Sequence, residues 1–148
     1  LNLGLDPFER RLNKEYLINK FYKSKTSIKQ ILLNQNIICG IGNIYACEIL
    51  FDARISPFMP ANKLNDSMVN EPIKSIRKIL KKAIISGGSS LRNYVSADGI
   101  LGNFQNNFKV YNQEGKKIYS FKIRRIKQNG RSTFYCPKLQ KSNYNPFR

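Results

Sequence analysis

Charge is distributed unevenly along this chain of 148 residues, and the asymmetry divides the chain into two regions. Residues 116–148 carry ten basic side chains and no acidic one, whereas the preceding residues carry 16 basic and nine acidic side chains. The net charge of +17 is the electrostatic signature of a protein that binds polyanions. Nucleic acid is the first expectation for the partner, and an anionic membrane surface is the second.

Composition excludes several classes of function. The chain has no histidine, so it cannot supply the serine–histidine–aspartate or cysteine–histidine catalytic systems, a histidine general base or a histidine metal ligand. Its three cysteines, Cys39, Cys47 and Cys136, form no CxxC pair, which fits a reduced compartment. No run of about 18 apolar residues could span a membrane. We therefore expect a cytoplasmic protein without a membrane partner, and its hydrophobic fraction of 41% suffices for one modest core.

The first region is typical of a series of short helices separated by turns. Pro and Gly mark their ends, and Asp or Ser marks their starts. We expect helices from an Asp6-Pro7 start toward Lys23, after a Ser27 cap, after a turn at Gly40 to Gly42, and over about 65–86. The polar, glycine-containing segment 89–107 is expected to be a mobile loop.

The second region is typical of short β-strands. Segments 108–111, 118–127 and 132–136 have strand composition, and the Asn129-Gly130 pair is a strong signal for a tight hairpin turn. The fold class expected is therefore mainly α with a small β part. We place the boundary so that 1–107 is a helical domain and 108–148 is a basic β-hairpin.

The motif GIGN at 40–43 is a candidate anion site. Gly40 and Gly42 leave backbone amides accessible, and the start of a helix attracts negative charge, while Asn43 adds a side-chain donor. The alternative is a glycine-bearing turn that binds nothing. Lys29 on the preceding helix is a further candidate for a phosphate contact, although a solvated surface charge is the more ordinary role of a lone lysine.

The expected hairpin is a candidate for contacting a nucleic-acid backbone. Arg131 lies beside the turn, among strands that are uniformly cationic, and such a ribbon can pair with phosphates through charge and bidentate hydrogen bonds. The alternative is a solvated edge ribbon whose lysines prevent aggregation. No two carboxylates have a spacing that indicates acid–base catalysis, and Glu48, inside an apolar helix, is the only acidic residue that stands out.

Four segments together resemble a known family. They are LLNQNIICGIGNIYACEILFDARISPFMPA at 32–61, GGSSLRNYV at 87–95, FQNNFKVY at 104–111 and GRSTFYCPKLQK at 130–141. In order and spacing they resemble the C-terminal half of formamidopyrimidine-DNA glycosylase, a bacterial base-excision repair enzyme that removes oxidised purines such as 8-oxoguanine and has AP lyase activity. NIYACEILF is closer to this family than to its relative endonuclease VIII.

The resemblance implies a helix-two-turn-helix domain followed by a two-stranded finger, both binding double-stranded DNA around a damaged purine. Asn43, Tyr111 and Arg131 match the positions that hold phosphates in the family. The expected mobile loop matches the segment that contacts the everted base, which must leave the stack before its glycosidic bond can be reached. The contacts implied there are Ser89 and the main-chain amides of Leu91, Arg92, Asn93 and Tyr94.

The chain departs from the family pattern at the finger's zinc site. The family uses two CxxC pairs, and the matching positions here are Ile118, Phe121, Cys136 and Leu139. One thiolate cannot hold a structural zinc, which takes four ligands. We therefore expect no metal and no cofactor, and a finger held by apolar contact among Ile118, Phe121 and Leu139.

A second departure concerns catalysis. The resemblance places the family's nucleophile, an N-terminal proline amine, and an adjacent glutamate in a β-sandwich domain that these 148 residues do not contain. We expect this piece to bind DNA without cutting it, in association with the bacterial nucleoid. A separately supplied N-terminal catalytic domain is a further expected partner. The alternative is a non-catalytic ribosomal or RNA-associated protein, since such proteins use a similar GIG turn before a helix.

Overall fold

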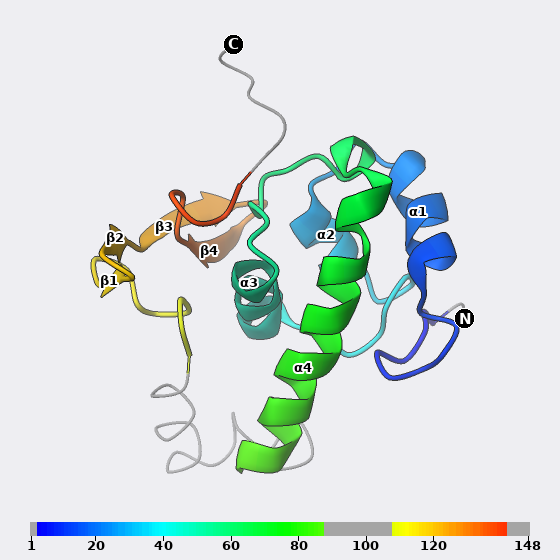
Figure 1. Cartoon of the computed structure of the whole chain (residues 1–148), viewed down its shortest axis with the longest axis horizontal. Helices are drawn as coiled ribbons and strands as arrows, with labels where there is room; N and C mark the ends of the chain where they lie inside the picture. The colour runs from blue at the N-terminus through cyan, green and yellow to red at the C-terminus, as the bar shows by residue number, and fades with distance from the viewer. Residues whose placement is uncertain (1–2, 88–107, 142–148) are drawn as a thin grey trace.

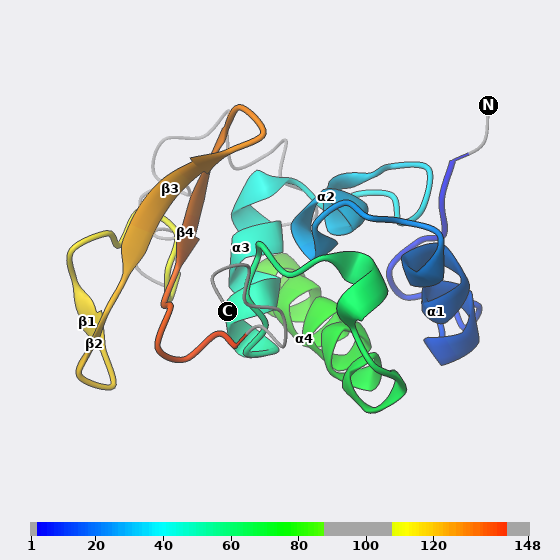
Figure 2. The same ribbon diagram turned by 90° about the horizontal axis from the view of Figure 1, so that it is seen from above.

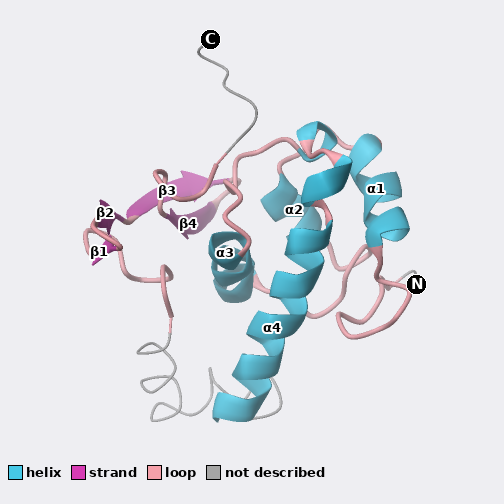
Figure 3. Cartoon of the chain, in the orientation of Figure 1, coloured by secondary structure: helices cyan, strands magenta, loops and turns pink. Residues whose placement is uncertain are grey.

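The computed structural model describes residues 3–87 and 108–141, and within these ranges helices dominate over two small antiparallel sheets (Figure 1). The helices are α1 (Lys14–Tyr22), α2 (Ile28–Leu33), α3 (Asn43–Asp52), the 3-10 turns η1 (Ala61–Lys63) and η2 (Asp66–Met68), and α4 (Asn70–Gly87). The strands are β1 (Lys117–Ile118), β2 (Phe121–Lys122), β3 (Arg124–Gln128) and β4 (Arg131–Tyr135). The expected fold class, mainly α with a small β part, is confirmed (Figure 3).

Helix α3 is the central element of the molecule. Figure 2 shows the β3–β4 hairpin on one side of α3, α2 and α4 on its other side, and α1 farthest from the hairpin. The main core fills the space among the helices, and Leu17, Ile28, Ile49 and Ile76 are among its fully buried side chains. No helix in the described ranges combines the length and the apolar composition that a membrane crossing requires.

The first helix begins later than the sequence predicts. The Asp6 carboxylate accepts the backbone N–H of Phe8, only two residues ahead, so Asp6-Pro7 forms a turn and α1 begins at Lys14. The guanidinium of Arg77 in α4 donates to three backbone carbonyls between these points. The segment forms short turns in place of a helix, with the N–H of Glu9 on the carbonyl of Asp6 and the N–H of Leu12 on the carbonyl of Glu9, and Arg77 ties these turns to α4.

The last helix also begins later than expected. Asn65 caps the 3-10 turn η2, because its side chain accepts the backbone N–H of Met68 at 3.1 Å, and α4 begins at Asn70. Pro72 therefore lies in the first turn of α4, where the backbone N–H has no partner inside the helix and its loss costs nothing.

The hairpin turn at Asn129-Gly130 is confirmed, with positive φ angles of 51° and 79°. The strand expected over 118–127 is wrong as a single element. The backbone takes positive φ angles of 49° and 72° at Tyr119 and Ser120, which reverses the chain between β1 and β2 before β3 begins. The second region thus contains a small hairpin followed by a longer one.

The strand expected over 108–111 is not formed, because these backbone amides bind a carboxylate. Glu48 of α3 accepts the N–H groups of Lys109, Val110 and Tyr111 at 2.7, 2.9 and 2.9 Å. Its side chain is buried, with 4% of the residue exposed. Burial raises the pKa of Glu48, and the three backbone hydrogen bonds act in the opposite direction. The acidic residue that stands out in the sequence is thus the anchor of the segment that leads into the finger.

A second apolar cluster joins α3 to the finger. Cys47 and Phe51 of α3 pack with Val110, Ile123, Phe134 and Cys136. Because two helical side chains belong to this cluster, the finger is bound to α3 by buried surface as well as by Glu48.

Replacement of Glu48 by Gln tests the anchor. Glutamine keeps the shape but has one acceptor oxygen, so at least one buried backbone N–H loses its partner. Glu48→Gln is expected to lower the free energy of unfolding by about 2 kcal/mol, measured by urea denaturation at neutral pH. Glu71→Gln, at an exposed position in α4, is the matched control. Equal effects of the two substitutions would contradict the role given to Glu48.

An ion pair between α3 and α4 predicts a pH dependence of stability. Asp52 accepts hydrogen bonds from Lys78 at 2.9 Å and from Ser75 at 2.7 Å. Burial acts to raise the pKa of Asp52, but these hydrogen bonds and the charge of Lys78 outweigh it and lower this pKa below its ordinary value. The stabilisation is therefore present above the unfolded-state pKa and is lost as the pH falls through the folded-state pKa.

We expect Asp52→Asn to reduce the free energy of unfolding by about 1 kcal/mol at pH 7, since Lys78 is half-exposed and solvent screens the pair. The difference from the parent chain should shrink on acidification below about pH 4. Asp66→Asn in η2, an exposed position, serves as the control and should change little. A pH-independent loss in Asp52→Asn would refute the assignment.

Candidate nucleic-acid interface

The turn before α3 is held by one side chain. The amide of Gln35 donates to the carbonyls of Leu33 and Ile41 at 3.1 Å, and its oxygen accepts the N–H of Gly40 at 2.7 Å. Gly40 has a φ of 91°, a conformation that favours glycine. Gly42 occupies the N-cap of α3 and has no side chain to satisfy the first amides of the helix. The GIGN motif therefore presents the open N-terminus of a ten-residue helix.

Asn43, the first residue of α3, connects this helix to the hairpin. Its Nδ2 donates to the backbone carbonyl of Ser132 at 3.0 Å. Its Oδ1 is buried and has no hydrogen-bond partner in the described part of the chain. One of the two amide hydrogens is thus committed to the hairpin, and the other stays available as a donor.

Lys29 of α2 is buried rather than solvated, with 1% of the residue exposed. Its ammonium donates to Oγ1 of Thr133 at 2.7 Å, and Thr133 in turn donates to the side-chain oxygen of Gln128 at 3.0 Å. The amide of Gln128 donates to the hydroxyl of Ser27 and to the carbonyl of Pro57, both at 3.0 Å. This polar network fastens α2 to both strands of the longer hairpin.

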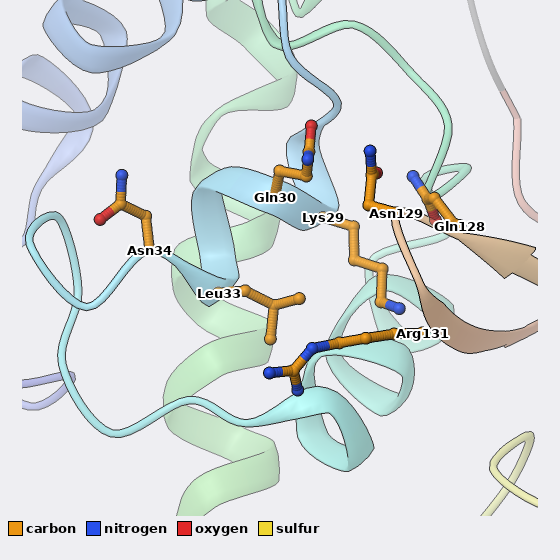
Figure 4. Close-up of a pocket in the computed structure, with 7 residues that line it drawn as sticks. All are labelled: Lys29, Gln30, Leu33, Asn34, Gln128, Asn129 and Arg131. Carbon is orange, nitrogen blue, oxygen red and sulfur yellow. The ribbon is translucent and has the colours of Figure 1, made fainter.

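A cleft of about 200 Å³ lies between α2 and the hairpin tip, and both Lys29 and Arg131 line it (Figure 4). Arg131 is exposed, and among the described residues it forms no ion pair. Burial lowers the pKa of Lys29, and the positive charge of Arg131 acts in the same direction. No carboxylate lines the cleft, so it holds two neighbouring cations without a protein counter-ion. The cleft therefore favours an anion.

Tyr111 lies on the same hairpin through aromatic contacts. Its ring packs edge-on against Phe134 of β4, with centroids 4.7 Å apart, and against Phe108, at 5.9 Å. Its backbone is fixed by Glu48. The position of Tyr111 is therefore set both by α3 and by the finger.

The structure brings the phosphate-binding candidates to one strand. Asn43 contacts Ser132, Lys29 contacts Thr133, and Tyr111 contacts Phe134, while Arg131 precedes all three on β4. Their joint binding of one sugar-phosphate backbone stays a prediction. The lesion-contact candidates Ser89, Leu91, Arg92, Asn93 and Tyr94 lie outside the described residues.

Sequence reasoning did not find Gln128 and Thr133, whose side chains are buried in the network with Lys29. Gln128 lies just beyond the strand expected over 118–127, so alternation along the expected strands did not place it with Thr133. Nothing local indicates that these two side chains meet α2.

The residues at the zinc positions of the family do not fit zinc. Of the four, only Cys136 is a possible ligand, and it is buried in the apolar cluster between α3 and the finger. Among the described residues, no group of three or more histidine, cysteine, aspartate or glutamate side chains could hold a metal ion. Ile118 and Leu139 pack against this cluster. Phe121 is the register partner of Ile118 across β1–β2 and is 40% exposed, and the expected apolar contact among the three residues stays a prediction.

Comparison with known proteins finds relatives that belong to one family. A glycosylase of Zymomonas mobilis is 45% identical over 141 residues, and one of Rickettsia africae is 43% identical over 143. Both are formamidopyrimidine-DNA glycosylases, and each match covers 95% of this chain and 52% of the relative. The chain thus spans about half the length of the curated relatives it matches.

Solved structures agree with these relatives. The Lactococcus lactis glycosylase in complex with abasic-site DNA superposes with a TM-score of 0.81 at 38% identity, covering 95% of this chain and 52% of that one. MutM in complex with DNA containing carbocyclic 8-oxo-G has a TM-score of 0.81 at 37% identity, covering 95% and 51%. These matches do not favour the ribosomal or RNA-associated alternative.

The model of the formamidopyrimidine-DNA glycosylase H2TH domain matches residues 3–95, which is more than half of the chain. Together with the relatives and the superposed structures, this match shows that the chain belongs to the formamidopyrimidine-DNA glycosylase family and corresponds to its C-terminal half.

Proposed function

We propose that this chain binds the sugar-phosphate backbone of double-stranded DNA where the N-terminus of α3 meets the tip of the longer hairpin. The observation that carries the proposal is the cleft in which Lys29 and Arg131 lie together without a carboxylate. Two cations beside uncapped helix amides form a site that a phosphate would neutralise.

Each candidate has a distinct role in this interface. Arg131 supplies an exposed guanidinium that can bind a phosphate through two hydrogen bonds. Asn43 supplies its free amide hydrogen, and Tyr111 its phenol. Gly40 and Gly42 let the backbone approach the phosphate closely. Lys29 acts mainly through its charge, since its ammonium already donates to Thr133.

The biological role that we propose is that of the DNA-binding half of an enzyme repairing oxidised purines, with the helical part to residue 107 and the finger from residue 108 as its two units. In this proposal Ser89, Leu91, Arg92, Asn93 and Tyr94 contact an everted base such as 8-oxoguanine. A β-sandwich domain, within the same protein or supplied separately, carries the glycosylase and AP lyase chemistry. The site of action is the nucleoid.

Arg131→Ala tests the phosphate-binding site. If four to six phosphates are neutralised on a duplex of about 20 base pairs, the logarithm of the binding constant should fall against log salt with a slope of about −4 to −5. The substitution should weaken binding to all sequences alike and reduce the magnitude of that slope by about 1. Fluorescence anisotropy at several salt concentrations measures both quantities.

Arg10→Ala removes the same charge from an exposed position in the segment before α1. Helix α1 lies on the side of the molecule away from the hairpin (Figure 1). This control should retain the slope of the parent chain. A salt-independent affinity for the duplex, or equal behaviour of the two variants, would overturn the proposed interface.

A metal-independent finger is a second expectation of the proposed function. Because the finger is held by its apolar cluster and by Glu48, a strong chelator should leave the thermal unfolding temperature and the duplex affinity unchanged. Elemental analysis of the purified chain checks the same point. Stoichiometric zinc, or unfolding on chelation, would show that the finger is built differently.

A further inference from the structure

A second pocket, which the proposed interface does not use, lies at the opposite end of the longer hairpin from its tip. It has a volume of about 370 Å³ and is built from β2, from the first half of β3 and from the end of β4 with the residues that follow. We call it the outer pocket. Its lining includes Phe121, Lys122, Arg124, Ile126, Tyr135 and Lys138.

The outer pocket and the proposed DNA contacts use different parts of the ribbon. Arg124 and Tyr135 are partners in the β3–β4 register, so their side chains lie on one face of the ribbon. Phe134, which contacts Tyr111, is their neighbour in the alternation and lies on the other face. Arg131 lies four residues from Tyr135, roughly 13 Å away along an extended strand.

The floor of the outer pocket is apolar and accessible. Phe121 and Ile126 are each 40% exposed, although both lie in strands where they could have been covered. The ring of Tyr135 is half-buried and packs edge-on against Phe58 at 5.3 Å between centroids. Exposed apolar side chains gathered in a concavity are typical of a docking site for an apolar group of a ligand.

The rim of the outer pocket is cationic. Lys122, Arg124 and Lys138 line it, and no carboxylate lines it with them. Among the described residues, none of these three forms an ion pair. The rim therefore selects a ligand that carries negative charge on both sides of an apolar group.

The apolar floor and the cationic rim together distinguish among the ligands that could bind in the outer pocket. Duplex DNA would satisfy the cations but would leave the apolar floor uncovered, since phosphates do not bury apolar surface. A second copy of the chain carries the same charge of +17 and would bring cations against cations. A peptide with one large apolar side chain between carboxylates satisfies both the floor and the rim.

We propose that the outer pocket binds an acidic peptide segment of a partner protein. One aromatic or aliphatic side chain of the peptide lies on Phe121 and Ile126, and its flanking carboxylates pair with Lys122, Arg124 and Lys138. This role is independent of the DNA interface proposed above.

The direct test uses fluorescein-labelled Asp-Asp-Phe-Asp-Asp, titrated with the full chain in low-salt buffer and followed by fluorescence anisotropy. Asp-Asp-Ala-Asp-Asp has the same charge and lacks the apolar side chain. The phenylalanine peptide is expected to bind about tenfold more tightly than the alanine peptide, since burying one aromatic side chain contributes at least that factor.

Two substitutions at exposed positions locate the binding. Phe121→Ala should remove most of the difference between the two peptides, and Lys138→Glu should weaken both. Lys63→Glu makes the same charge change at an exposed position in η1, which does not line the outer pocket, and should alter peptide binding much less. Circular dichroism confirms that each variant is folded. Arg131→Ala should leave the preference for the phenylalanine peptide intact, which separates this test from that of the DNA interface.

Several outcomes would overturn the proposal. Equal affinity for the two peptides would show attraction by net charge alone, and an unaltered preference in Phe121→Ala would place the peptide elsewhere. If Phe121→Ala weakened duplex binding as much as peptide binding, the pocket would belong to DNA. If sedimentation velocity showed a dimer that Phe121→Ala dissociates, the occupant would be a second copy of the chain.

Discussion

The arrangement of the finger depends on one buried carboxylate. Glu48 sits in the middle of α3, and its two oxygens receive three successive backbone N–H groups from residues 109–111. A backbone that turns in this way cannot join a sheet, so the chain enters the finger at an angle set by the helix. Tyr111 and the apolar cluster around Cys47 and Phe134 follow from that entry point. Loss of this anchor would release the entry segment from α3 and leave the finger held by the apolar cluster and by Asn43.

A second constraint is the charge on Lys29. A buried ammonium normally pairs with a carboxylate, but here it donates a hydrogen bond to the hydroxyl of Thr133, and Arg131 lies nearby. Burial of an ammonium without a carboxylate costs free energy. The hydrogen bonds of the network through Gln128 offset this cost because they satisfy the polar groups around Lys29. The repulsion left over is what makes the cleft receptive to an anion. In this sense the proposed binding site is electrostatically incomplete in the free protein.

Local signals in the sequence predicted local structure well. Ser27 caps α2 by accepting the N–H of Gln30, and Asn129-Gly130 forms the turn that its residues favour. Predictions failed where a distant residue decides the outcome. The segment after Asp6-Pro7 forms turns in place of the expected helix, and its carbonyls bind Arg77 from far along the chain. The burial of Lys29 likewise depends on a hydroxyl 104 residues away, which no pattern around α2 reveals. Local motifs singled out Asn43, Lys29 and Arg131, and the family resemblance added Tyr111, whereas the contacts of these residues with β4 could not be predicted without the fold.

The shared core between α3 and the finger has a consequence for recognition. Since the hairpin is joined to α3 near its tip by Asn43 and lower down by apolar packing, the two walls of the interface form one stiff unit. Helix α3 and the hairpin therefore lose little conformational entropy when a ligand binds. A duplex bound as proposed would meet a preformed surface, so any bending would have to occur in the nucleic acid. Duplex sites whose base steps unstack easily would then be bound more tightly than stiff sites. The local deformability of the duplex would therefore contribute to site selection before any base is contacted.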